Sequence, residues 1–138
     1  MEKKYPKFVV GAFMLNDKGE LFLRTTPKQD NKYTCINEKV EWGSTIEETL
    51  RKNIKEKTNL DMKSFALIGL TDGLNIAATD NPEPNNLIFA DYKVFVKNIN
   101  EFKSDDERKH KWLLPSEWLK IDKALFGPYI REVIEKLV

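Results

Sequence analysis

The sequence predicts an α+β fold in which a mixed β-sheet lies between helices. Three observations predict it: β-forming segments recur along the chain, an amphipathic helical pattern interrupts them after residue 45, and a second apolar stripe begins near residue 128. The 138 residues suit one domain with a single core, so we expect one domain over residues 1–138.

Composition is that of a globular protein, with 41% hydrophobic and 33% charged residues. The formal net charge of +1 gives no reason to expect a nucleic-acid or membrane-surface partner. The single cysteine, Cys35, excludes an internal disulfide and fits a reducing compartment. No apolar stretch approaches the roughly 20 residues that span a bilayer. We therefore expect a cytoplasmic protein with neither a nucleic-acid nor a membrane partner.

The first elements form a predicted hairpin. Residues 8–15 are rich in β-forming side chains and predict a buried strand rather than a signal peptide. Residues 16–19 are a turn signal in which Gly19 can adopt a positive φ. Residues 21–23 then predict a second strand that ends at Arg24. A polar loop and a short extended segment are expected next, at 27–32 and 33–36.

The clearest element is an amphipathic helix over residues 46–58. Ser44 and Thr45 can each cap it, because a glutamate follows each of them three residues later. Asn59 can end the helix in a left-handed conformation. Three apolar residues recur every four positions and are expected to face the core: Ile46, Leu50 and Ile54.

The second half of the chain alternates strands with loops. Residues 65–70 and 87–97 predict strands, and 72–86 predict a long loop, of a length that is often functional. The remaining expected elements are a charged loop at 100–110, an extended piece at 112–114, a short helix opened by Pro115, and a final helix from near Pro128. Trp112 and Trp118 are expected to pack in the core or a groove.

Several short motifs together resemble the Nudix hydrolases, the family with the MutT-like fold. They are Leu21-Phe22-Leu23-Arg24, Tyr33, Val40-Glu41-Trp42-Gly43 and Trp112-Leu113-Leu114-Pro115. The resemblance spans roughly the whole chain and implies a Nudix-like α/β/α sandwich. It also implies a loop–helix–loop that holds a divalent metal against a diphosphate. The implied ligand is a nucleoside triphosphate, or a nucleoside diphosphate linked to another group, such as a nucleotide sugar.

The helical part of the family signature is degenerate in this chain. Three glutamates of the family converge from this helix, and their positions hold Asn53, Glu56 and Lys57. Mg²⁺ prefers oxygen ligands. An ammonium a few ångströms from a dication repels it by roughly several kcal/mol at an effective dielectric constant near 20. We therefore expect metal-dependent pyrophosphate hydrolysis to be weakened or altered.

The resemblance implies a specific catalytic set if the protein is a hydrolase. Mg²⁺ or Mn²⁺ would bind Glu56, helped by Glu41 from the preceding loop. Glu107 or His110 would be the base that activates water. Glu56 has a simpler interpretation as a solvent-facing residue paired with Lys52.

A metal-free binding site is the alternative. Lys57 can place a fixed positive charge where a metal would sit, pairing with Glu56 and Glu41 or with a ligand phosphate. Further phosphate contacts are expected from Arg24, Lys39 and Lys52. Trp42 can stack on a base, seal the pocket or form a homodimer contact. The sequence thus leaves open a weakened hydrolase, a non-catalytic nucleotide-binding, sensor or interaction module without a cofactor, and a structural dimer.

Overall fold

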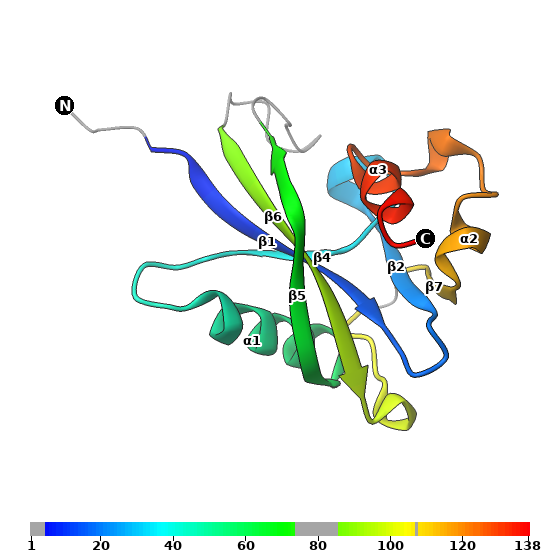
Figure 1. The fold of residues 1–138 in the computed structure, drawn as a ribbon, viewed down its shortest axis with the longest axis horizontal. Coiled ribbons are helices and arrows are strands. Elements are labelled where there is room, and N and C mark those ends of the chain that lie inside the picture. Colours follow the sequence, from blue (N-terminus) through cyan, green and yellow to red (C-terminus); the bar gives the residue numbers. More distant parts are fainter. Residues whose placement is uncertain (1–4, 74–85, 107) are drawn as a thin grey trace.

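The computed structural model describes residues 5–73, 86–106 and 108–138 (Figure 1). The strands are β1 (Lys7–Leu15), β2 (Leu21–Thr26), β3 (Lys32–Thr34), β4 (Ile36–Lys39), β5 (Asp61–Asp72), β6 (Leu87–Lys97) and β7 (His110–Leu113). The helices are α1 (Ile46–Thr58), α2 (Pro115–Trp118) and α3 (Ile130–Glu135), with 3-10 turns at Pro27–Gln29, Ile99–Glu101 and Lys123–Leu125. The expected alternation of strands and helices is confirmed.

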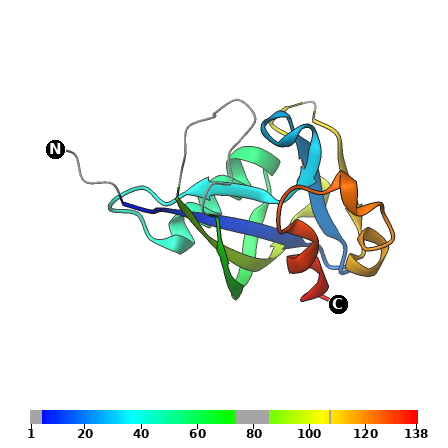
Figure 2. The ribbon, with the colours of Figure 1, turned by 90° about the horizontal axis from the view of Figure 1, so that it is seen from above.

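The described strands form one mixed sheet. Its order is β3-β2-β1-β6-β5, with β4 beside β1 and β7 beside β2. β1 and β6 are parallel along their length, and the other pairs are antiparallel. Helices α1 and α3 lie on opposite sides of β1 (Figure 1), and Figure 2 shows the same sheet and helices from above. The predicted α+β sandwich with a mixed sheet between helices is therefore confirmed.

Helix α1 has the predicted bounds, because its end signals are local. The Thr45 side chain accepts a hydrogen bond from the Glu48 backbone N–H at 3.1 Å, which resolves the choice between Ser44 and Thr45. Asn59 ends the helix with φ 61°. The predicted apolar stripe packs on the sheet, with Leu50 and Ile54 fully buried and Ile46 half-buried.

The sheet separates two apolar clusters. On one face, α1 packs over even-numbered residues of β1 such as Val10 and Met14. On the other face, α2 and α3 cover odd-numbered residues such as Phe13. Trp118 is fully buried there and donates from Nε1 to the Leu21 carbonyl at 2.9 Å. The expected inward stripe of the last helix is confirmed, with Ile134 fully buried.

Strand lengths differ from the sequence prediction where tertiary pairing extends them. β5 spans Asp61–Asp72 rather than 65–70, because it pairs with β6 from Asp61↔Lys97 to Asp72↔Ile88. Segment 33–36 divides between two strands that pair with different partners, β3 with β2 and β4 with β1. Most of the predicted loop at 72–86 lies outside the described residues.

Over the described residues, no helix combines the length and apolarity needed to cross a lipid bilayer.

Replacing the capping residue of α1 tests this local origin of the helix. We expect Thr45→Ala to lower the free energy of unfolding by about 1 kcal/mol, because the N–H of Glu48 loses its acceptor. Ser44→Ala is the matched control and is expected to change it by less than about 0.5 kcal/mol. Urea denaturation of the two variants measures both values, and equal losses would contradict the assignment of the cap.

Candidate functional site

The candidate site opens where β2 and β4, which pair with different parts of β1, diverge from each other. β4 pairs with β1 from Val9 to Ala12, whereas β2 meets it at Leu15↔Leu21. A cavity of about 710 Å³ lies over the sheet face opposite α1. Val9, Phe89 and Asp91 from the sheet line its floor, and Ile130 and Val133 at the start of α3 line another wall. This volume falls in the range of small-molecule sites.

The charged lining of the cavity is predominantly basic. Among the described residues, the acidic members are Glu38, Asp91 and Asp105, and the basic members are Lys7, Arg24, Lys28, Lys39, Lys57 and Arg108. A concave surface with one dominant sign of charge concentrates ligands of the opposite sign. The site is therefore suited to an anion.

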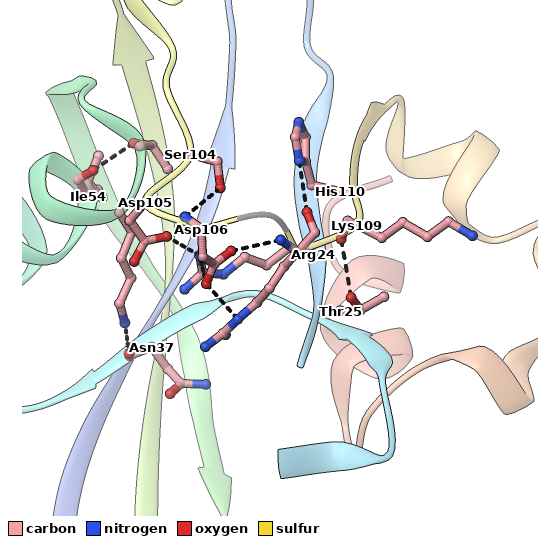
Figure 3. Close-up of polar contacts among 12 residues, drawn as sticks. Arg24, Thr25, Asn37, Ile54, Ser104, Asp105, Asp106, Lys109 and His110 are labelled. Carbon is pink, nitrogen blue, oxygen red and sulfur yellow. Dashed lines mark hydrogen bonds and ion pairs between the residues drawn. The ribbon is translucent and has the colours of Figure 1, made fainter. Parts of the chain in front are cut away.

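Arg24 is a buried member of the basic residues that line the cavity. It extends from β2, its side chain is 5% exposed, and its Nη1 donates to the Asp105 carboxylate at 2.7 Å (Figure 3). The loop that carries Asp105 is tied to the end of α1, since the backbone N–H groups of Lys103 and Asp105 donate to the carbonyls of Thr58 and Lys57. The tertiary fold thus brings β2, α1 and the loop before β7 together.

Lys57 extends from the last turn of α1 toward β4. Its Nζ donates to the Asn37 carbonyl at 2.9 Å (Figure 3) and lies 3.9 Å from the Glu38 carboxylate. Its protein partners are therefore on β4, rather than the Glu56 and Glu41 considered from the sequence. Burial lowers the pKa of Lys57, while the nearby Glu38 opposes that shift.

The helix positions that would ligate a metal do not converge as carboxylates. Asn53 is 1% exposed, and its Oδ1 and Nδ2 have no hydrogen-bond partner among the residues that the structure describes. Glu56 faces solvent 3.9 Å from Lys52, as the simpler interpretation expected. Glu41 is exposed in the loop before α1, and neither glutamate lines the cavity. Across the described part of the chain, no three His, Cys, Asp or Glu side chains form a group that can hold a metal.

The two predicted bases lie apart from the cavity lining or outside the described residues. His110 is on β7, where its ring packs against Phe22 and Phe102 at centroid distances of 5.6 and 5.1 Å. Its Nδ1 lies 3.3 Å from the Arg108 carbonyl (Figure 3). Glu107 is outside the described residues. An aromatic environment accounts for the position of His110 without a catalytic role.

The other predicted ligand contacts are divided between the cavity and the solvent. Lys39 lines the cavity, as do Arg24 and Lys57. Lys52 is on the exposed side of α1, with its side chain 76% exposed. Trp42 is fully exposed in the loop before α1 and does not line the cavity. A dimer contact at Trp42 stays a prediction.

Two buried polar residues lie on the cavity floor, and the sequence analysis did not predict one of them, Asp91. Cys35 and Asp91 are 5% and 6% exposed, and Thr71 Oγ1 donates to Asp91 Oδ2 at 2.8 Å. Burial raises the pKa of Asp91, and burial together with the Asp91 charge raises the pKa of Cys35 to about 12. The thiol is therefore neutral at physiological pH and suits packing, not nucleophilic attack. The sequence did contain a signal for Asp91, because it is an acidic residue within the otherwise largely apolar segment 87–97.

Comparison with solved structures identifies the fold, while no protein-family model and no curated protein matches the sequence. The chain is similar to a MutT protein from Methanosarcina mazei Go1, with TM-score 0.73 and 18% identity over 99% of this chain and 96% of that one. It is also similar to a MutT Nudix hydrolase from Burkholderia pseudomallei, with TM-score 0.75 and 16% identity over 98% and 100% of the two chains. A Nudix hydrolase from Nitrosomonas europaea gives TM-score 0.73 and 17% identity over 96% and 88%.

These similarities show that the chain has the Nudix fold, which confirms the fold implied by the sequence motifs. Identities this low establish the fold, and not the function.

Replacing Asp91 on the cavity floor tests how much its burial lowers the free energy of unfolding. The folded-state pKa of Asp91 lies above its ordinary value of 3.8, so the free energy of unfolding falls as pH rises from that value through the folded-state pKa. We expect Asp91→Asn to raise the melting temperature at neutral pH and to remove this part of the pH dependence. Thermal melts at acid and neutral pH measure it, with Asp17→Asn on the exposed first turn as control. A lower melting temperature at neutral pH would contradict the expectation.

Proposed function

We propose that this protein binds a nucleoside triphosphate, or a nucleoside diphosphate linked to another group, without a divalent metal and without turning it over. One observation carries the proposal. The ammonium of Lys57 borders the cavity from the helix position at which the family resemblance implies a metal-binding glutamate. A built-in cation at this position supplies positive charge that a bound metal would otherwise supply.

The cationic lining supports phosphate binding. Arg24 uses Nη1 for Asp105, and a guanidinium carries five N–H donors in all, so donors remain for a ligand. Charge-assisted hydrogen bonds from arginine and lysine to phosphate oxygens are stronger than neutral ones. Lys39 and Arg108 border the same cavity and add positive charge to it.

The shape and polarity of the cavity support a nucleotide in particular. Its volume of about 710 Å³ exceeds what an isolated phosphate needs. Apolar side chains stand beside the charged ones, and Val9, Phe89, Ile130 and Val133 provide a surface for a flat heterocycle. Phosphates against the basic residues and a base against these side chains would use both parts of the lining.

Mg²⁺ or Mn²⁺ does not fit the donor set of this helix. The three positions offer a buried amide, a solvent-facing carboxylate beside Lys52, and an ammonium. Hard divalent cations bind clustered oxygen ligands, and a carboxylate already paired with a lysine is a poor one. This donor set therefore does not support a metal-dependent hydrolytic step.

Slow metal-dependent pyrophosphate hydrolysis is the second candidate function. The fold shared with MutT and Nudix hydrolase structures favours it. In that case Glu56 and Glu41 would be the ligands and Glu107 or His110 the base. Release of a nucleoside monophosphate, or of pyrophosphate from a triphosphate, across a nucleotide panel with Mg²⁺ would establish turnover and contradict the first proposal, provided that it is lost in EDTA and in Glu56→Gln.

Removing the Lys57 charge tests metal-free binding. By calorimetry with ADP-ribose, GDP-mannose and nucleoside triphosphates, we expect binding to be equal in Mg²⁺ and in EDTA. We expect Lys57→Gln to weaken it by about 1.5–3 kcal/mol, the usual value of a hydrogen bond to a charged group. The matched control is Lys52→Gln on the exposed side of the same helix. Binding that requires Mg²⁺, or equal losses in both variants, would refute the proposal.

Reversing the same charge tests the idea that Lys57 stands in for a metal. Lys57→Glu puts a carboxylate near Glu38, in a place where the charge of Asp105 also acts. Glu38 and the introduced carboxylate then offer oxygen ligands with no lysine between them, while Asp105 stays paired with Arg24, so we expect the variant to bind Mn²⁺ about tenfold more tightly than the unmodified protein. Titration followed by electron paramagnetic resonance measures free Mn²⁺, with Lys52→Glu as control. If Lys57→Glu binds Mn²⁺ no more tightly than Lys52→Glu does, the idea that Lys57 takes the place of a metal is contradicted.

A further inference from the structure

Asp91 occupies an unusual place on the floor of the cavity. It lies in β6, between Gly11 of β1 and Gly69 of β5 in the strand register. Directly paired residues of neighbouring strands point to the same face of a sheet, so neither neighbour covers the carboxylate with a side chain. Glycine within a strand often marks a place where a ligand or another backbone comes close.

The space above Gly11 is limited by polar atoms of the floor. A Cβ at this position would lie 3.0 Å from Asp91 Oδ1 and 3.3 Å from Cys35 Sγ. Gly11 therefore allows the carboxylate and the thiol to lie side by side on the floor, and both line the cavity. Asp91 is held by Thr71 through its Oδ2, with only 6% of the residue exposed. The Asp91 carboxylate is therefore held in one orientation on the floor of the cavity.

A purely structural role explains Asp91 poorly. Burial raises its pKa, so an ionised carboxylate at this place lowers the stability of the fold. A well-packed apolar residue in place of a buried charge is often neutral or stabilising. The charge of Lys136 moderates the cost, and the Lys136 Nζ lies 3.4 Å from where a Cβ on Gly69 would be. Costly polar groups that line a cavity are candidates for ligand recognition.

We infer that Asp91 is a specificity-determining residue that accepts hydrogen bonds from the exocyclic amino group of a nucleobase lying on the cavity floor. The inference rests on the proposed function and concerns the base of the ligand, which the basic residues do not contact. An ionised carboxylate has four lone-pair sites and no donor. Thr71 uses one of them, so Asp91 can accept further N–H groups and is mismatched to a carbonyl at the same place.

The division of charge in the cavity orients such a ligand. Arg24 and Lys57 attract phosphates where β2, α1 and the loop before β7 meet. Asp91 repels phosphate and lies on the sheet among Val9, Phe89 and Ile130, which suit a flat ring. A nucleotide bound with its phosphates at the lysine and arginine therefore places its base toward Asp91.

Matched nucleotide pairs test this inference by calorimetry in EDTA. GDP and IDP differ only by the 2-amino group, and CDP and UDP present an amino group and a carbonyl at the same ring position. We expect the amino member of at least one pair to bind about tenfold more tightly, a difference equivalent to about 1.4 kcal/mol. Asp91→Ala is expected to abolish that difference, whereas pyrophosphate, which contacts the basic residues, is expected still to bind this variant.

A second variant keeps the test valid if Asp91→Ala does not fold. Asp91→Asn keeps the shape of the side chain and an acceptor for Thr71 but loses the charge, so we expect it to reduce the preference for the amino member. Thermal melts establish that each variant is folded before binding is measured.

The outcomes separate this inference from the function on which it rests. If pyrophosphate binds but neither pair is distinguished, or if the preference persists in folded Asp91 variants, the assignment of Asp91 is wrong and phosphate binding stands. If neither pyrophosphate nor any nucleotide binds the unmodified protein, the proposed function fails and the inference fails with it. A preference that disappears with the carboxylate while pyrophosphate still binds supports both.

Discussion

The parallel pairing of β1 with β6 is the constraint on which the rest of the structure depends. It runs from Lys7↔Leu87 to Leu15↔Phe95 and gives the sheet its two distinct faces. Even-numbered residues of both strands pack beneath α1, whereas odd-numbered residues face the cavity and α3. A shift of this register by one residue would exchange the two faces, moving Asp91 into the apolar cluster under α1.

The candidate site is a basic cavity that the end of α1 borders through Lys57. Helix α1 ends where its last turn meets β4 and the loop before β7, the junction at which the resemblance implies a bound metal. Here a lysine hydrogen-bonded to a backbone carbonyl occupies that junction, and an arginine paired with Asp105 lies nearby. A fixed cation can attract a diphosphate, yet it cannot polarise water as a metal does. A site with a fixed cation in place of a metal can therefore bind a diphosphate without cleaving it.

Two buried polar groups and one partly buried lysine lie near the site. Among the described residues Asn53 has no hydrogen-bond partner, while burial lowers the pKa of Lys57 and raises the pKa of Asp91. Natural proteins break packing rules mainly at functional sites, where activity or binding compensates for the lost stability. The concentration of three such groups around one helix face and one cavity therefore supports a function at this place, whichever ligand it has.

The sequence by itself determined the elements whose signals are local. The bounds of α1 follow from the Thr45 cap, the four-residue apolar spacing and left-handed Asn59, and the bounds of β6 follow from a continuous β-forming segment. Arg24, Lys39 and Lys57 were also predicted as site residues and do line the cavity. Only the tertiary structure decided that β5 extends to Asp61, that Lys57 pairs with Asn37 and Glu38, and that Asp91 lies between two glycines. These features depend on which strands become neighbours, and contacts between residues far apart in the chain leave no periodic signal in the sequence.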